Sequence, residues 1–215
     1  MSAPDSRTEL TRRLLDEAGT TYAQQAGIHL TNTPMPLFQL LVLAMLAAKP
    51  IHADTATAAA RELWGAGLRT PGAVLGGDRA RMIEAFGRAG YARYDESSAT
   101  RLTDMATMVR DDYHGDLRGL AERAGGDTGE AARLLTRFKG IGATGAAIFL
   151  REVQDAWPWV RPYFDERARQ AAGQLGLPTD PDRLGALACG DNARLAAALE
   201  RVSRDERLMG ELTGS

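Results

Sequence analysis

Apolar residues recur at the spacing of a helix along most of the chain, and no stretch alternates apolar and polar residues over the length of a strand. The longest apolar run, "PLFQLLVLAMLAA", predicts a buried helix over residues 36–48. A longer amphipathic pattern covers residues 94–115. Every intervening loop is short, so we predict a compact all-α protein.

In the rest of the chain, glycines mark the expected ends of further helices, and Asp, Ser or Thr residues mark their expected beginnings. One helix is predicted over residues 8–25, and Asp54 is predicted to cap the helix that follows the turn after residue 48. A short helical turn is expected within residues 69–78. The remaining predicted helices lie within residues 54–67, 78–90, 116–127, 127–138, 143–157 and 166–177, with two more C-terminal to these.

The stretch "TRFKGIGATGAAIFL" brings Gly140, Gly142 and Gly145 together at the start of a helix. Glycine inside regular structure costs roughly 0.5–1 kcal/mol relative to alanine, so a compensating role is expected. Successive backbone N–H groups of such a turn, with those of the helix after it, can bind a phosphate, while Ile141 anchors the turn in the core. The alternative is a tight turn between two helices that binds nothing.

Composition excludes some classes of protein. The 215 residues carry a net charge of −2, and the basic residues are arginine apart from Lys49 and Lys139. Cys189 is the one cysteine, so four-cysteine iron–sulfur ligation is impossible and a reducing, cytoplasmic location is expected. The N-terminal segment has no apolar core typical of a signal peptide, and the longest apolar run is too short to span a bilayer.

The segments "FKGIGATGAAIFL" and "YFDERARQAAGQLGL" resemble the hairpin and the aspartate-containing segment of helix–hairpin–helix DNA glycosylases, the endonuclease III-like proteins. "PLFQLLVLAMLAAKPIHADTATAAARELW" and the segment from residue 82 to 109 are similar to the first helices of that family. The resemblance covers roughly residues 34–178. It implies a two-lobed helical fold with a DNA cleft between a lobe of residues 34–150, whose helix–hairpin–helix spans 133–155, and a lobe of residues 1–33 plus 151–215.

By this resemblance Asp165 matches the family's catalytic aspartate, whose carboxylate stabilises the cationic sugar formed as the base leaves. From spacing alone, Asp165 equally fits a helix cap. Thr144 stands where bifunctional members carry a nucleophilic lysine, and a threonine has no amine to form an imine. Lys139 replaces a proline and is expected to face phosphate. Glu166 and Arg167 replace the family's histidine, which leaves the orientation of Asp165 open.

Lys49 falls where relatives place a glutamine near the extruded nucleotide, so it is a candidate for DNA contact and a weaker candidate for catalysis; a solvated lysine at a helix end is the alternative. His52, Tyr163 and Trp159 are candidates for a base pocket, since flipped bases stack on aromatic or apolar side chains. Each aromatic residue taken singly is more typical of a core. From Arg133 to Arg169 the chain holds seven basic and four acidic residues.

Together these features predict a base-excision repair enzyme, a bacterial monofunctional DNA glycosylase that acts as a monomer on double-stranded DNA. Lys139, Gly140, Ile141, Gly142, Thr144, Gly145 and Lys49 are its predicted DNA-binding residues. No metal site, iron–sulfur cluster or membrane contact is expected, and a monovalent cation at the hairpin is an open prediction. The alternative is a DNA-binding protein on the same scaffold that has lost its chemistry, which the altered lysine, the lost histidine and the acidic net charge favour.

Overall fold

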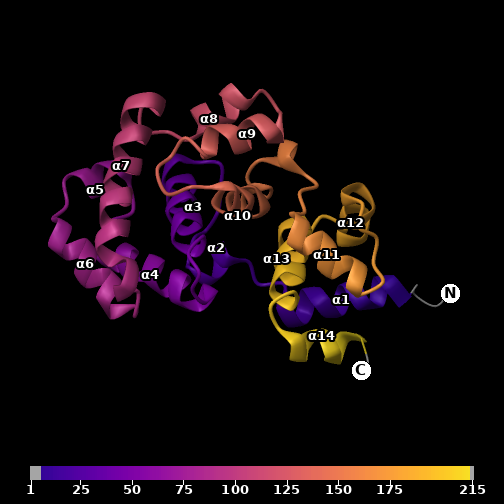
Figure 1. Cartoon of the computed structure of the whole chain (residues 1–215). Helices are drawn as coiled ribbons and strands as arrows, with labels where there is room; N and C mark the ends of the chain where they lie inside the picture. Colours follow the sequence, from indigo (N-terminus) through magenta and orange to yellow (C-terminus); the bar gives the residue numbers. More distant parts are fainter. Residues whose placement is uncertain (1–5, 214–215) are drawn as a thin grey trace.

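The apolar run predicted as a helix over residues 36–48 lies in the central helix α3 (Pro34–Ala47), which begins at Pro34. Eleven of its residues are buried, so neighbouring helices cover it on nearly every side. Helices α4 (Ala53–Gly65) and α10 (Ala143–Val153) pack directly against it. The structure is a computed structural model that describes residues 6–213, and the described residues form helices and no strands (Figure 1).

The elements follow the expected order along the chain. The N-terminal elements are α1 (Ser6–Ala18) and α2 (Tyr22–Gln25). Beyond α4 come α5 (Pro71–Leu75), α6 (Arg79–Arg88), η1 (Ala92–Tyr94), α7 (Asp95–Tyr113), α8 (Arg118–Ala124) and α9 (Thr128–Leu135). Beyond α10 come η2 (Pro158–Val160), α11 (Glu166–Gln174), α12 (Pro181–Ala188), α13 (Asn192–Val202) and α14 (Glu206–Thr213). No helix in the described part of the chain has the length and apolar character needed to cross a membrane.

Two predictions about where helices begin were wrong: a second helix start at Thr21 was missed, and the wrong residue was assigned as the N-cap of α4. The single helix predicted over residues 8–25 is interrupted, because Thr21 begins α2 with a capping box. Its hydroxyl accepts the Gln24 N–H, and the Gln24 side chain accepts the Thr21 N–H in return. At α4 the cap position belongs to His52, while Asp54 lies within the first turn and accepts a hydrogen bond from Gln25.

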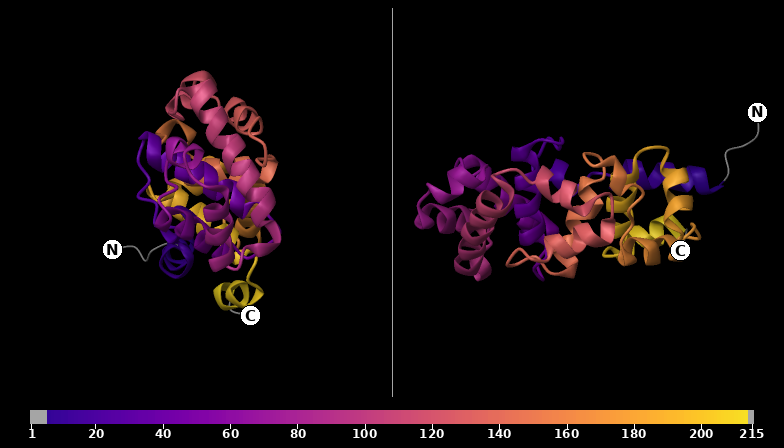
Figure 2. Two further views of the ribbon diagram at one scale, coloured as in Figure 1. Left: turned by 90° about the vertical axis from the view of Figure 1, so that its left-hand side faces the viewer. Right: turned by 90° about the horizontal axis from the view of Figure 1, so that it is seen from above.

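Buried apolar side chains form two separate clusters. The larger cluster surrounds α3 and takes in α4, α6, α7, α9 and α10. The smaller cluster joins α1 to α11, α12, α13 and α14. Residues 22–28 and 153–160, which the sequence analysis grouped with the second lobe, contribute buried side chains to the larger cluster. The two groups of helices lie toward opposite ends of an elongated molecule (Figure 2).

Candidate functional site

The turn between α9 and α10 contains glycines with different conformations. Gly140 has φ +96°, a backbone angle that favours glycine, and a Cβ there would lie 2.7 Å from Cδ of Arg101. Ile141 is 4% exposed and anchors the turn in the larger cluster. Gly142 is the N-cap of α10 in an extended conformation, with open space where a Cβ would stand.

The first turn of α10 is open to solvent while its next turn is buried. Ala143 and Thr144 are exposed, and the N–H groups of a helix's first turn have no partner inside the helix. Gly145 is buried, and a Cβ there would lie 3.3 Å from Ile141 and 3.6 Å from the carbonyl oxygen of Ala44. Gly145 therefore lets α10 lie close to α3, with its N-terminus turned outward.

Asp165 caps α11, and both of its carboxylate oxygens are engaged. Oδ1 accepts the Ala168 N–H at 2.9 Å, and Oδ2 accepts a hydrogen bond from Nη1 of Arg151 at 2.6 Å. The Asp165 side chain is 13% exposed and that of Arg151 is 2% exposed. This pairing of α10 with α11 fixes the orientation of the carboxylate, which the sequence left open.

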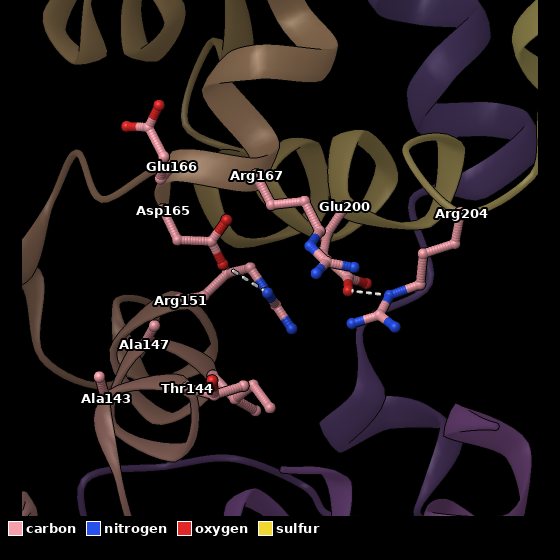
Figure 3. Close-up of a pocket in the computed structure, with 10 residues that line it drawn as sticks. Ala143, Thr144, Ala147, Arg151, Asp165, Glu166, Arg167, Glu200 and Arg204 are labelled. Carbon is pink, nitrogen blue, oxygen red and sulfur yellow. Dashed lines mark hydrogen bonds and ion pairs between the residues drawn. The ribbon is translucent and has the colours of Figure 1, made fainter. Parts of the chain in front are cut away.

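Asp165 and the start of α10 line one pocket of about 260 Å³ (Figure 3). Three parts of the chain contribute to it: α10 from its first residue to Arg151, the N-cap and first residues of α11, and the end of α13 with Arg204, two residues beyond it. Its charged lining residues are Arg151, Asp165, Glu166, Arg167, Glu200 and Arg204. The carboxylate of Asp165 and the guanidinium of Arg151 both extend into the space between the helices, whereas Glu166 points away from it.

A buried ionic network lies beneath this pocket. Glu200 accepts the Tyr22 hydroxyl at 2.5 Å and also pairs with Arg204. Burial alone would raise the pKa of Glu200, but Arg151, Tyr22 and Arg204 outweigh it and hold that pKa below its usual range. Glu200 therefore stays ionised and balances the arginines around it.

The charge of Arg151 is compensated from several sides. Burial disfavours that charge, but Glu200, Asp165 and Glu152 together raise the pKa of Arg151. The guanidinium also lies over the Tyr22 ring, 5.3 Å from its centroid. Glu152 accepts the backbone N–H groups of Tyr22 and Ala23 at 3.3 and 2.8 Å, and burial raises the pKa of its carboxyl.

The segment that leads into Asp165 is held by a buried glutamine. Gln154 accepts the Tyr163 N–H at 3.0 Å and donates to the Tyr163 carbonyl oxygen at 3.0 Å. Trp157 is buried and donates its indole N–H to Asn32 at 3.1 Å. Asp165 thus follows a segment that is fixed at both ends.

The structure places the predicted pocket aromatics in or beside the larger core. Trp159 stacks on Trp157 with ring centroids 5.5 Å apart, and Tyr163 is half-buried against the same cluster. Burial followed by the charge of Asp165 raises the pKa of Tyr163. Neither residue lines the pocket beside Asp165, whose lining has no aromatic side chain.

The two lysines lie apart from that pocket. Lys139 is exposed and its ammonium lies 3.2 Å from Asp104 on α7. The Lys49 ammonium lies over the Tyr94 ring, 5.7 Å from its centroid. His52 is exposed and lines a neighbouring hollow together with Arg204, which also lines the Asp165 pocket. Of the predicted site residues, the structure gathers Thr144 and Asp165 in one pocket.

Sequence reasoning missed Arg151, Glu200 and Arg204 as members of the site. A weak signal existed for the first, because "AAIFLREV" sets a charged pair inside an apolar helix, where charges are rarely buried without partners. Nothing local marks Glu200, whose partner Tyr22 lies 178 residues away along the chain. No group of three or more His, Cys, Asp or Glu side chains placed to hold a metal ion occurs among residues 6–213.

Comparisons of the chain with protein-family models, curated proteins and solved structures found no match.

Proposed function

We propose that this chain is a monofunctional DNA glycosylase of the helix–hairpin–helix type, which releases a damaged or mispaired base from double-stranded DNA. In this proposal α9, the glycine turn and α10 form the hairpin that holds the DNA backbone. Asp165 supplies the carboxylate beside the reacting sugar. The observation that carries the proposal is that Asp165 and the exposed start of α10 line the same pocket.

The geometry supports a division of labour between backbone and carboxylate. Free N–H groups at the start of α10 suit a phosphate, and phosphate contacts position DNA without reading its sequence. A carboxylate at the edge of the pocket suits the positive charge that develops on the sugar as the glycosidic bond breaks. Arg151 holds one oxygen of Asp165, which favours an ionised carboxylate acting through its charge.

The proposed reaction ends with an intact abasic site. Thr144 has no amine, and Lys49 is not among the residues that line the Asp165 pocket. Without a nearby amine the sugar cannot be held as an imine. We therefore expect no covalent complex after borohydride treatment, and strand breaks only after alkali. Trapping in the wild type that disappears in Lys49→Ala would instead make Lys49 the nucleophile.

The first prediction concerns Asp165→Asn. Asparagine preserves the helix cap but removes the negative charge, so base release should fall by about 10²–10⁴-fold. Single-turnover base release from a panel of damaged and mispaired duplexes measures this. Asp155→Asn is the matched control, since Asp155 is exposed and paired with Arg161, and it should leave the rate unchanged. Equal rates for Asp165→Asn and wild type would contradict the catalytic role.

One observation favours the second candidate, a DNA-binding protein without chemistry. Both oxygens of Asp165 already accept hydrogen bonds within the protein, as expected of a structural cap in a buried ion pair. Duplex binding by the wild type with no base release from any lesion in the panel would support this candidate. Thermal melts of Asp165→Asn are needed in either case, because removing one partner of a buried ion pair costs about 3–5 kcal/mol.

A further inference from the structure

We propose that the pocket beside Asp165 binds a phosphate group, held by Arg167 and Arg204 opposite the start of α10. This inference deepens the proposed function, since it rests on nucleic acid as the source of the phosphate. In this inference two arginine side chains make a second phosphate contact, distinct from the backbone contact expected at the glycine turn.

Two arginines from different elements line the same pocket. Arg167 lies in the first turn of α11, and Arg204 follows the end of α13. Both are exposed, and Arg167 has no carboxylate within ion-pair distance among the described residues. Figure 3 shows both side chains directed into the space that Asp165 and Thr144 also border. Arginine presents a planar fork of N–H donors that matches phosphate oxygens.

Arg151 adds a buried positive charge beneath the same space. Its Nη1 is taken by Asp165, whereas its Nε and Nη2 have no hydrogen-bond partner within the described protein. The closest approach between Arg151 and Glu152 is from Nε to Oε1, at 3.8 Å. A buried guanidinium with an unpaired donor edge is unusual, because unpaired buried donors are costly. Nε and Nη2 are both buried, and Asp165, Glu200 and Glu152 already offset the charge of Arg151, so an anion in the pocket would interact with Arg151 through its charge rather than through a direct hydrogen bond.

The acids around the pocket leave this positive potential in place. Asp165 pairs with Arg151 and also accepts the Ala168 N–H, and Glu200 pairs with Arg204 and also accepts the Tyr22 hydroxyl. Glu166 is 71% exposed, points out of the pocket and lies within ion-pair distance of Arg169. Arg151 and Arg204 are thus balanced by Asp165 and Glu200, so the unpaired positive charge in the lining is that of Arg167, to which the N-terminus of α10 adds its partial positive charge.

The space fits a phosphate with part of its sugar. A volume of about 260 Å³ corresponds to roughly eight or nine water molecules at liquid density. The pocket lining combines six charged side chains with apolar ones, and it has no aromatic side chain on which a base could stack. This chemistry favours the phosphate end of a nucleotide over its base.

The test titrates inorganic phosphate, then a deoxynucleoside 5′-monophosphate, into the 215-residue protein while the backbone amide signals of Glu166 and residue 167 are followed by NMR. We expect saturable shifts in the wild type and an affinity about tenfold to a hundredfold weaker in both Arg167→Gln and Arg204→Gln. Arg183→Gln removes an exposed arginine on α12 and should bind as the wild type does. Circular dichroism confirms that each variant is folded; Arg167→Gln breaks no ion pair and is the cleaner of the two.

A second arm uses duplex DNA. The double variant should reduce the slope of log affinity against log salt by about one, the value for one neutralised phosphate. Phosphate binding that is unchanged in both variants, or absent from the wild type, overturns the inference. Base release with a normal salt slope in the double variant also overturns it and leaves the glycosylase proposal standing. Phosphate binding that depends on both arginines, without any duplex binding, supports the site and overturns the proposed function.

Discussion

Tyr91 shows how one buried side chain fixes the region around Lys49. Its hydroxyl donates to the Leu46 carbonyl oxygen in the last turn of α3, at 3.2 Å, and its ring packs against Tyr94 at 6.0 Å between centroids. The Lys49 ammonium lies over that same Tyr94 ring. Tyr91 therefore supports both the end of α3 and the aromatic face on which Lys49 rests.

Tyr91→Phe should lower stability by about 1 kcal/mol at neutral pH, since it deletes one buried hydrogen bond. Burial raises the pKa of Tyr91 to about 12, above the value of 10 expected when the chain is unfolded. The stabilisation from a protonated Tyr91 is thus complete below pH 10 and is lost as pH rises toward 12, by about 1.4 kcal/mol per pH unit. Urea unfolding at pH 8, 10 and 11.5 measures this. Equal losses in wild type and variant above pH 10 would contradict it.

At the same scale, sequence reasoning reached Asp165 but not its surroundings. A lone Asp before a helical pattern predicts an N-cap, because capping depends on local backbone geometry, and Asp165 does cap α11. The ion pair with Arg151 depends instead on how α10 and α11 meet, which no local spacing encodes. Lys139 shows the same limit, because its partner Asp104 lies on α7, a helix that precedes it in the chain.

At the scale of elements, the glycine turn between α9 and α10 assigns different roles to its glycines. Gly140 is required by the backbone, because its φ of +96° and the nearby Arg101 and Met45 side chains leave no room for a Cβ. Gly142 has an ordinary extended conformation and empty space beside it. Its small size exposes the N–H groups at the start of α10 without being needed for the fold.

Gly140→Ala should therefore destabilise the protein by about 1–3 kcal/mol. Gly142→Val should cost less than about 1 kcal/mol, yet weaken duplex binding to a similar extent for every DNA sequence, because its side chain would shield the phosphate site. Thermal melts and fluorescence anisotropy on several unrelated duplexes measure the two effects. Normal duplex binding by a folded Gly142→Val would mean that the turn only connects two helices.

The helices themselves were largely predictable. Helical periodicity and capping residues predicted an all-α chain, which the structure confirms over residues 6–213. The split at residues 19–21 was missed because the capping box of Thr21 and Gln24 competes locally with a helical pattern that continues through it. Periodicity reports which face is apolar, but not which of two compatible helix starts the tertiary contacts select.

At the scale of the whole molecule, a few polar contacts join the two clusters. Arg151 belongs to α10, whose apolar side chains lie in the larger cluster, and it pairs with Asp165 at the start of α11, which packs in the smaller one. Tyr22 is buried in the larger cluster, and its hydroxyl donates to Glu200 on α13. Tyr22 and Glu200 lie 178 residues apart, and the pairing of Arg151 with Asp165 depends on how α10 and α11 meet, so neither pair could be inferred from the sequence.

The positions of the tryptophans allow this coupling to be measured. The chain has three tryptophans, and Trp64, Trp157 and Trp159 all lie in or against the larger cluster. Tryptophan fluorescence therefore reports the unfolding of that cluster, whereas far-UV circular dichroism reports helices in both. Coincident denaturation curves from the two probes are expected of the wild type if the clusters unfold as one cooperative unit.

Arg151→Met should separate the two curves. Methionine keeps much of the apolar length but leaves Asp165 and Glu200 without their buried cationic neighbour, a loss of about 3–5 kcal/mol. Because the smaller cluster has fewer buried apolar side chains, we expect circular dichroism to begin falling at a lower urea concentration than tryptophan fluorescence. Arg133→Met is the matched control: that arginine is 64% exposed on α9, and its loss should change the free energy of unfolding by less than about 0.5 kcal/mol. If both probes still coincide in Arg151→Met, other contacts than this ion pair couple the clusters.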